Sequence, residues 1–201
     1  MGASFILNLL RIIVSLNKVQ IMNIEKLKYP IGIYTSNKNP SEEILNGWIQ
    51  DIEDFPKKLI ALTQSLSHEK LNWKYRPGGW TIKQVIHHCA DSHMNSIIRF
   101  KLALTEKNPT IRPYYEDRWA ELPDSLNDNI APTLQLINGL HNKWSDLLRS
   151  LNPDQLQRQF MHPEHGTIFN LAENIGFYAW HCNHHLAHIH QALESDNIYI
   201  L

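Results

Sequence analysis

The sequence has few of the residues that build disulfide-rich, fibrous or strongly charged proteins. Two cysteines among 201 residues cannot form a disulfide framework, so a hydrophobic core must hold the fold, and a reducing, cytoplasmic compartment is expected. Eight glycines and ten prolines exclude collagen-like and low-complexity chains. Nineteen basic residues against twenty acidic ones leave a formal charge of −1. That balance argues against a nucleic-acid partner, because binding a phosphate backbone requires a basic surface.

The sequence also lacks an apolar run long enough to cross a membrane. Residues 5–16 are apolar but broken by Asn8 and Arg11, whereas a spanning helix needs about 20 apolar residues. A basic segment before this run and a small-residue cleavage site after it are both missing, which argues against a signal peptide. We therefore interpret residues 1–28 as an N-terminal extension, with Met22 as a candidate true start, and 29–201 as the single domain. No membrane partner is expected.

Hydrophobic spacing in the rest of the chain is helical. Apolar residues recur every three or four positions in four segments, 44–66, 82–104, 134–151 and 171–193. Three of these segments follow helix-start signals: Asn39 with Pro40 and Glu42, Thr81 with Gln84, and Asn170 with Glu173. Pro56 predicts a kink or local irregularity in the first helix. Because no segment shows sustained strand-like alternation, the pattern predicts an all-α four-helix bundle.

A long segment, roughly residues 105–132, joins the second and third predicted helices. It contains Pro109, Pro113 and Pro123 before its last residue, Pro132, together with the aromatic residues Tyr114, Tyr115 and Trp119. Long loops in compact bundles are often functional. Two interpretations stay open: a lid over one end of the bundle, or an Ω-loop on its surface.

Histidine is the residue present in excess. The chain has twelve, and eight of them fall within residues 87–93 and 181–190. On the second helix, His93 projects onto the apolar face and His87 toward solvent. His88 borders the apolar face and begins a polar stripe that continues through Ser92, Asn95 and Arg99.

The fourth helix carries two histidines that project toward the core. At about 100° per residue, His185 lies about 40° and His181 about 80° from the centre of the apolar face. Two imidazoles four residues apart on one face can share a metal ion, and His88 supplies a third. The pair His184 and His188 has the same spacing but projects further outward. Three histidines leave an open coordination position, typical of a catalytic site; a solvated histidine face is the alternative.

The chemistry expected of such a site is hydrolysis by water activated on one divalent ion. The general base is unknown: no glutamate adjoins the first histidine of the pair, and Asp91 projects away from the core. Candidates for orienting the ligands or moving protons are His184, His188, Asn95 and Arg99. Cys89 and Cys182 are expected to be buried thiols.

Several segments resemble the YfiT-type metal-dependent hydrolases of the DinB-like superfamily. They are Tyr29–Gly32, YRPGGWTIKQVIHHCADSHMNSIIRFKLALTE (75–106), IRPY (111–114), FMHP (160–163) and FYAWHCNHHLAHI (177–189). The resemblance implies a DinB/YfiT-like four-helix bundle that is a cytoplasmic homodimer acting on a small molecule. It also implies one zinc or nickel ion, held by His88, His181 and His185. Cys182 and Asn183 depart from the Ser/His-rich run expected there, but leave the ligands intact.

Two other functions remain open. Related bundles transfer low-molecular-weight thiols, so the resemblance makes a metal-dependent bacillithiol S-transferase the leading alternative. Arg99, Arg112 and the aromatic residues of the long loop are its candidate binding groups. A non-catalytic metal-binding module is the second alternative, and it requires a fourth protein ligand such as His141 or Cys89.

Overall fold

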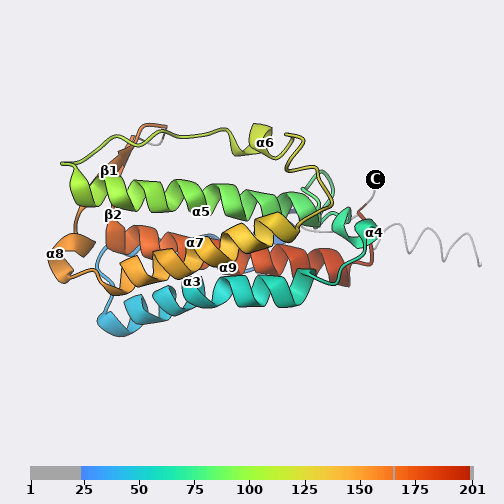
Figure 1. Ribbon diagram of the computed structural model, residues 1–201, viewed down its shortest axis with the longest axis horizontal. Helices are drawn as coiled ribbons and strands as arrows, with labels where there is room; N and C mark the ends of the chain where they lie inside the picture. The colour runs from blue at the N-terminus through green and yellow to red at the C-terminus, as the bar shows by residue number, and fades with distance from the viewer. Residues whose placement is uncertain (1–23, 165, 200–201) are drawn as a thin grey trace, which may run out of the picture.

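Four long helices form the body of the computed structural model, which describes residues 24–164 and 166–199 (Figure 1). They are α3 (Glu42–Thr63), α5 (Ile82–Thr105), α7 (Ala131–Arg149) and α9 (Leu171–Glu194). Each coincides with one of the four predicted segments, and the predicted all-α bundle is therefore confirmed. The proposed start at Met22, and the proposed extension up to residue 23, lie outside the described residues.

The order of the helices around the bundle differs from their order along the chain. Helices α3 and α5 each pack mainly against α7 and α9. The consecutive helices α3 and α5 therefore lie diagonally opposite each other in the bundle. Helices α3 and α9 run in one direction, and α5 and α7 run in the other (Figure 1). Because α5 and α7 are parallel, the chain between them must return about the full length of a helix, ~36 Å for the 24 residues of α5.

The segment 106–130 makes this return and is called here the crossover loop. It runs along the outside of α5 and contains the short helix α6 (Glu116–Trp119) (Figure 1). The loop therefore covers a side of the bundle, and the interpretation as a lid over its end is wrong. The parallel direction of α5 and α7 requires this path.

Polar contacts hold the crossover loop and the start of α7 against α5. The Lys83 ammonium lies 2.7 Å from a carboxylate oxygen of Asp128. His87 Nε2 donates to the carbonyl of Asn127 at 3.1 Å, and its Nδ1 lies 2.8 Å from the Thr133 hydroxyl. His87 is consequently only 7% exposed. The prediction that it faces solvent is wrong, because helical projection cannot show that a distant segment covers it.

The N-cap of the first long helix lies two residues later than predicted. Ser41 is the N-cap and its hydroxyl accepts a hydrogen bond from the Ile44 amide, whereas Asn39 and Pro40 precede the helix. Serine and asparagine are equally good caps, so the sequence alone did not choose between them. The predicted caps of the other two helices, Thr81 with Gln84 and Asn170 bonded to the Glu173 amide, are confirmed.

The remaining elements are short. Helices α2 (Ile24–Lys28), α4 (His68–Leu71) and α8 (Pro153–Leu156) flank the bundle, and β1 (Gln159–His162) pairs with β2 (Thr167–Asn170) as an antiparallel hairpin before α9. Each strand has four residues, too few for alternation to be recognised in the sequence. Within the described residues, no helix has the length and hydrophobicity needed to cross a membrane.

Pro56 lies inside α3 without interrupting the helix. Proline has no amide hydrogen, so the carbonyl of Ile52, four residues earlier, lacks its usual helical donor. The Nδ1 atom of His141 on α7 lies 2.6 Å from that carbonyl oxygen and supplies the missing donor. The predicted irregularity is thus a change of hydrogen-bond partner within a continuous helix.

A candidate three-histidine metal centre

Neighbouring helices α5 and α9 bring together the three histidines predicted to form a site. His181 and His185 lie one turn apart on α9 and face His88 on α5. Their side chains are 6%, 6% and 9% exposed in that order. Each offers a ring nitrogen, and the three nitrogens lie within 4.8 Å of one another.

The spacing of two ring nitrogens fits a tetrahedral ion. His88 Nε2 and His181 Nε2 are 3.3 Å apart. Two nitrogen ligands about 2.0–2.1 Å from zinc, at a tetrahedral angle, are separated by about 3.3–3.4 Å. The observed separation is therefore the one expected for two ligand atoms of a single cation. The three histidines fit such an ion.

Burial keeps the clustered histidines neutral. It lowers the pKa of His88 to about 4, with a smaller contribution from His184. The pKa values of His181 and His185 lie well below the usual range, first because of burial and then because of repulsion between the rings. Neutral imidazole is the form that binds metal.

Two further histidines on α9 pack beside the cluster. His188 donates from Nε2 to the Lys28 carbonyl at 3.1 Å, and its Nδ1 lies 3.4 Å from His185 Nδ1. His184 stacks on the Trp180 ring at 4.4 Å and contacts the His185 ring at 5.1 Å. Both predicted supporting histidines thus contact a clustered one, His188 through a hydrogen bond and His184 through its ring.

The other two predicted supporting residues lie differently. The Asn95 side chain donates to the Asp91 carbonyl of its own helix at 2.9 Å, and Asn95 does not line the cleft at the histidines. Arg99 lines the cleft in front of the three histidines. Its Nε is buried, and no hydrogen-bond partner is found for it within the described residues.

The cluster opens into a cleft of about 330 Å³ beside the crossover loop. The Ser92 hydroxyl lies 3.5 Å from His181 Nε2, and the Tyr178 hydroxyl lies 3.4 Å from the Ser92 hydroxyl. Burial, then nearby Tyr178, raises the pKa of Tyr114, which therefore stays a neutral donor. Residues of this cleft that the sequence did not single out as site residues include Trp80, Glu116, Glu164, Phe177 and Tyr178.

These residues were missed for identifiable reasons. Tyr178 follows the apolar spacing of α9, which predicts a core position, although its hydroxyl group reaches the cleft wall. Glu116 belongs to the crossover loop and Glu164 to the turn between the two short strands, and helical periodicity places neither of them. The three prolines and clustered aromatics of the long loop were the available signal.

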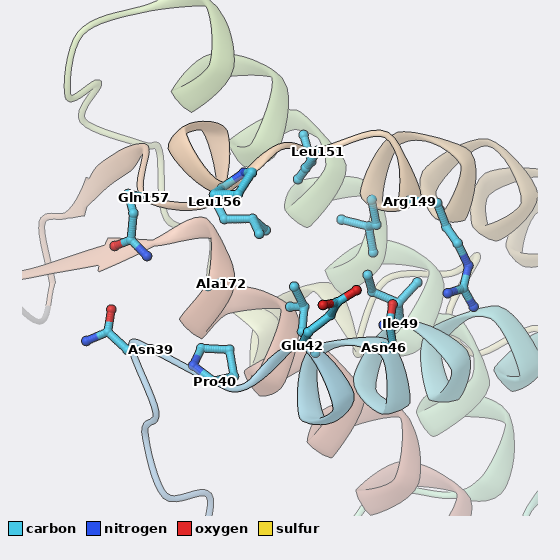
Figure 2. Close-up of a pocket in the computed structure, with 13 residues that line it drawn as sticks. Asn39, Pro40, Glu42, Asn46, Ile49, Arg149, Leu151, Leu156, Gln157 and Ala172 are labelled. Atoms are coloured by element: carbon cyan, nitrogen blue, oxygen red, sulfur yellow. The ribbon is translucent and has the colours of Figure 1, made fainter.

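A second cavity, of about 540 Å³, lies where α3 and α9 begin and α7 ends (Figure 2). It is lined by apolar side chains together with five polar or charged ones, and no histidine lines it; the five are Asn39, Glu42, Asn46, Arg149 and Gln157. The Arg149 guanidinium is already paired with Glu53 at 2.8 Å. Its lining offers no set of metal ligands, and the chemistry of the three histidines identifies the smaller cleft as the candidate site.

Neither candidate fourth ligand is available to a cation. Both ring nitrogens of His141 are engaged, Nδ1 by the Ile52 carbonyl and Nε2 by His93 Nδ1 at 2.7 Å. Cys89 is fully buried, and burial raises the pKa of its thiol. Among the residues that the structure describes, the metal-ligating group has only the three histidines.

A four-helix bundle with three histidines at one cleft defines the class of this protein, and comparisons identify its family. The sequence profile of the DinB superfamily matches residues 51–189. The chain is 52% identical over 171 residues to a Bacillus mycoides (strain KBAB4) protein named "Putative metal-dependent hydrolase", covering 85% of this chain and 98% of that protein. A Bacillus cereus (strain B4264) protein with the same name is 52% identical over 163 residues, covering 81% and 93%.

A solved structure agrees with this relationship. YfiT from Bacillus subtilis, described as "a probable metal-dependent hydrolase with an unusual four-helix bundle topology", superposes with a TM-score of 0.83. It is 45% identical, and the match covers 85% of this chain and 98% of that one. This chain therefore belongs to the DinB superfamily.

Proposed function

We propose that the protein is a metal-dependent hydrolase whose single divalent cation is held by His88, His181 and His185. The observation that supports this is the 3.3 Å separation of His88 Nε2 and His181 Nε2 in a buried, neutral cluster. A cation bound by three imidazoles lowers the pKa of water in its open position toward about 7, which supplies hydroxide for hydrolysis. Zinc or nickel is the proposed cation, since imidazole suits both.

The residues of the cleft have separate roles in this proposal. The Tyr114 phenol stays protonated and can donate to a substrate oxygen, and the Ser92 hydroxyl lies beside the ligand atoms. Trp80 packs on the His88 ring at 4.7 Å and limits its movement. Glu116 and Glu164 are the carboxylates that line the cleft and are available to accept a proton.

Replacing ligands tests the metal assignment. We expect His88→Ala and His181→Ala each to reduce bound metal from one equivalent to a small fraction, because two imidazoles cannot hold the ion as three do. Elemental analysis of the purified variants measures this. Asn183→Ala, on the same helix but bonded to Asp51, is the control and should keep one equivalent. Full metal content in both histidine variants would contradict the assignment.

Arg99 gives the thiol S-transferase specific support as a second candidate. Arg99 lines both the cleft and an adjoining cavity of about 120 Å³, and we propose that its guanidinium binds an anionic group of a thiol or substrate there. Arg112 and Tyr115 do not line the cleft. Turnover of bacillithiol with an electrophile, compared with a panel of esters and amides, distinguishes transfer from hydrolysis. A cytoplasmic homodimer stays a prediction, and light scattering would test the dimer.

A further inference from the structure

A row of buried imidazoles runs from His181 across the core to a backbone carbonyl. His181 Nδ1 lies 3.1 Å from His93 Nε2, and His93 Nδ1 lies 2.7 Å from His141 Nε2. His141 Nδ1 then lies 2.6 Å from the Ile52 oxygen. The row therefore connects α9, α5, α7 and α3, all four helices of the bundle.

The carbonyl at the end of this row determines the direction of every hydrogen bond in it. A carbonyl oxygen only accepts, so His141 Nδ1 carries the hydrogen. A neutral imidazole has one N–H, and His141 Nε2 therefore accepts from His93 Nδ1. His93 Nε2 in turn accepts from His181 Nδ1. The lone pair of His181 is consequently on Nε2, the atom that lies 3.3 Å from His88 Nε2.

The surroundings of the two middle rings keep them neutral. His93 and His141 are 0% exposed. Both pack against the rings of Phe55 and Trp144 at centroid distances of 5.2–5.9 Å. An apolar setting strongly disfavours a charged imidazolium, so each ring is neutral and carries one N–H hydrogen. Each ring therefore donates one hydrogen bond of the row and accepts the other.

Pro56 makes the carbonyl at the end of the row available. In an uninterrupted α-helix the amide of residue 56 would donate to the Ile52 oxygen, and proline has no such amide. The buried oxygen then needs another donor, because a buried polar group without a hydrogen-bond partner is destabilising. His141 Nδ1 meets that need, which anchors the row at its far end.

We propose that His93 and His141 are positioning residues of the metal site, holding His181 in the tautomer that presents Nε2 before metal arrives. The proposal rests on the proposed function only for the assignment of His181 as a ligand. Partners of a ligand's second ring nitrogen typically change metal affinity about 10–100-fold. Here that partner is His93, which is itself oriented by His141 and the Ile52 carbonyl. We therefore expect a change at His141 to lower metal affinity without altering a ligand.

Nitrogen-15 NMR of the metal-free full-length chain tests the tautomers directly. We expect His141, His93 and His181 each to show a protonated Nδ1 and a bare Nε2, the less common neutral form of histidine in water. This measurement does not depend on metal binding. A protonated Nε2 on His181 in the metal-free protein would overturn the proposal.

Two substitutions at His141 separate positioning from packing. His141→Phe keeps a ring but removes the acceptor for His93, and we expect zinc Kd to rise at least about 10-fold. His141→Gln retains an acceptor oxygen, and Kd should stay within about threefold of wild type. Competition with a chromophoric chelator gives Kd, and urea unfolding of each variant gives stability.

His87→Phe is the matched control, because His87, like His141, is a buried histidine with two hydrogen-bonded ring nitrogens. It should lower stability while leaving zinc Kd within about threefold of wild type. Wild-type affinity and wild-type tautomers in His141→Phe would overturn the proposal. If the wild-type chain binds no zinc or nickel, the proposed function fails, and the NMR result still decides whether the row orients His181.

Discussion

The second nitrogens of two clustered histidines face neutral acceptors. His181 faces His93, and His185 faces His188, whose own donor is satisfied by a backbone carbonyl. In many metal sites a carboxylate takes this place and offsets part of the cation's charge. The three-histidine group contains no carboxylate, so a bound divalent cation would keep its full charge toward the cleft.

Asp91 allows a test of electrostatics away from the cluster. Burial, then the charge of Asp124, raises the pKa of Asp91 from 3.8 to about 6. A raised carboxyl pKa contributes stability below the unfolded value, and that stability is lost as pH rises through the folded value. Asp91→Asn should therefore stabilise the protein at about pH 8, by less than about 1 kcal/mol because solvent screens this half-exposed site. Urea unfolding at about pH 8 and pH 4 measures the gain, and an equal gain at both would contradict the electrostatic cause.

The fate of individual residues shows what a sequence can predict. The pair His181 and His185 was recognisable because i and i+4 positions share a face in any helix. The hydrogen bond between His93 and His141 joins different helices, and no local pattern says that α5 and α7 are neighbours. His87 was misplaced for the same reason, since its cover comes from residues 40 positions away.

At the scale of helices, α3 and α9 approach closely at Gly176. A Cβ at this position would lie 2.8 Å from ring atoms of Trp48. Gly176→Ala should therefore destabilise the protein by about 1–3 kcal/mol, although alanine is the better helix former. Urea unfolding checks this value.

Gly47 supplies the comparison for that prediction. It lies on the exposed side of α3, and a Cβ there meets nothing within 4 Å. Gly47→Ala should stabilise the protein by about 0.5–1 kcal/mol through helix propensity alone. Equal effects of the two substitutions would show that the contact with Trp48 does not limit the approach of the helices.

The long helices were predictable and their connections were not. Apolar residues at every third or fourth position place four stripes that must be buried together, which is sufficient to predict a bundle. The packing order of the helices and the hairpin both depend on tertiary contacts. Short strands such as Gln159–His162 gain their stability from pairing with another strand. The path of the crossover loop follows from the packing order.

For the whole molecule, a ligand that joins α5 and α9 should stabilise the folded state. Zinc at about 100 times its Kd should add about 2.7 kcal/mol to the free energy of unfolding. For a chain of this length that corresponds to a rise in Tm of about 5–10 °C. Differential scanning calorimetry measures the shift, and excess EDTA should reverse it. A matching shift in His181→Ala would mean that the metal binds elsewhere.

The parallel pairing of α3 with α9 has a kinetic consequence. Asn183 on α9 donates to Asp51 on α3 at 3.0 Å, across 132 positions of the chain. Forming such a contact closes a long loop, and the entropic cost of that closure comes before the contact can stabilise the chain. Chains with a high contact order therefore fold slowly. An up-and-down bundle of equal length relies more on pairs of successive helices. This protein is therefore expected to fold more slowly than such a bundle, with a barrier set by the meeting of its first and last long helices.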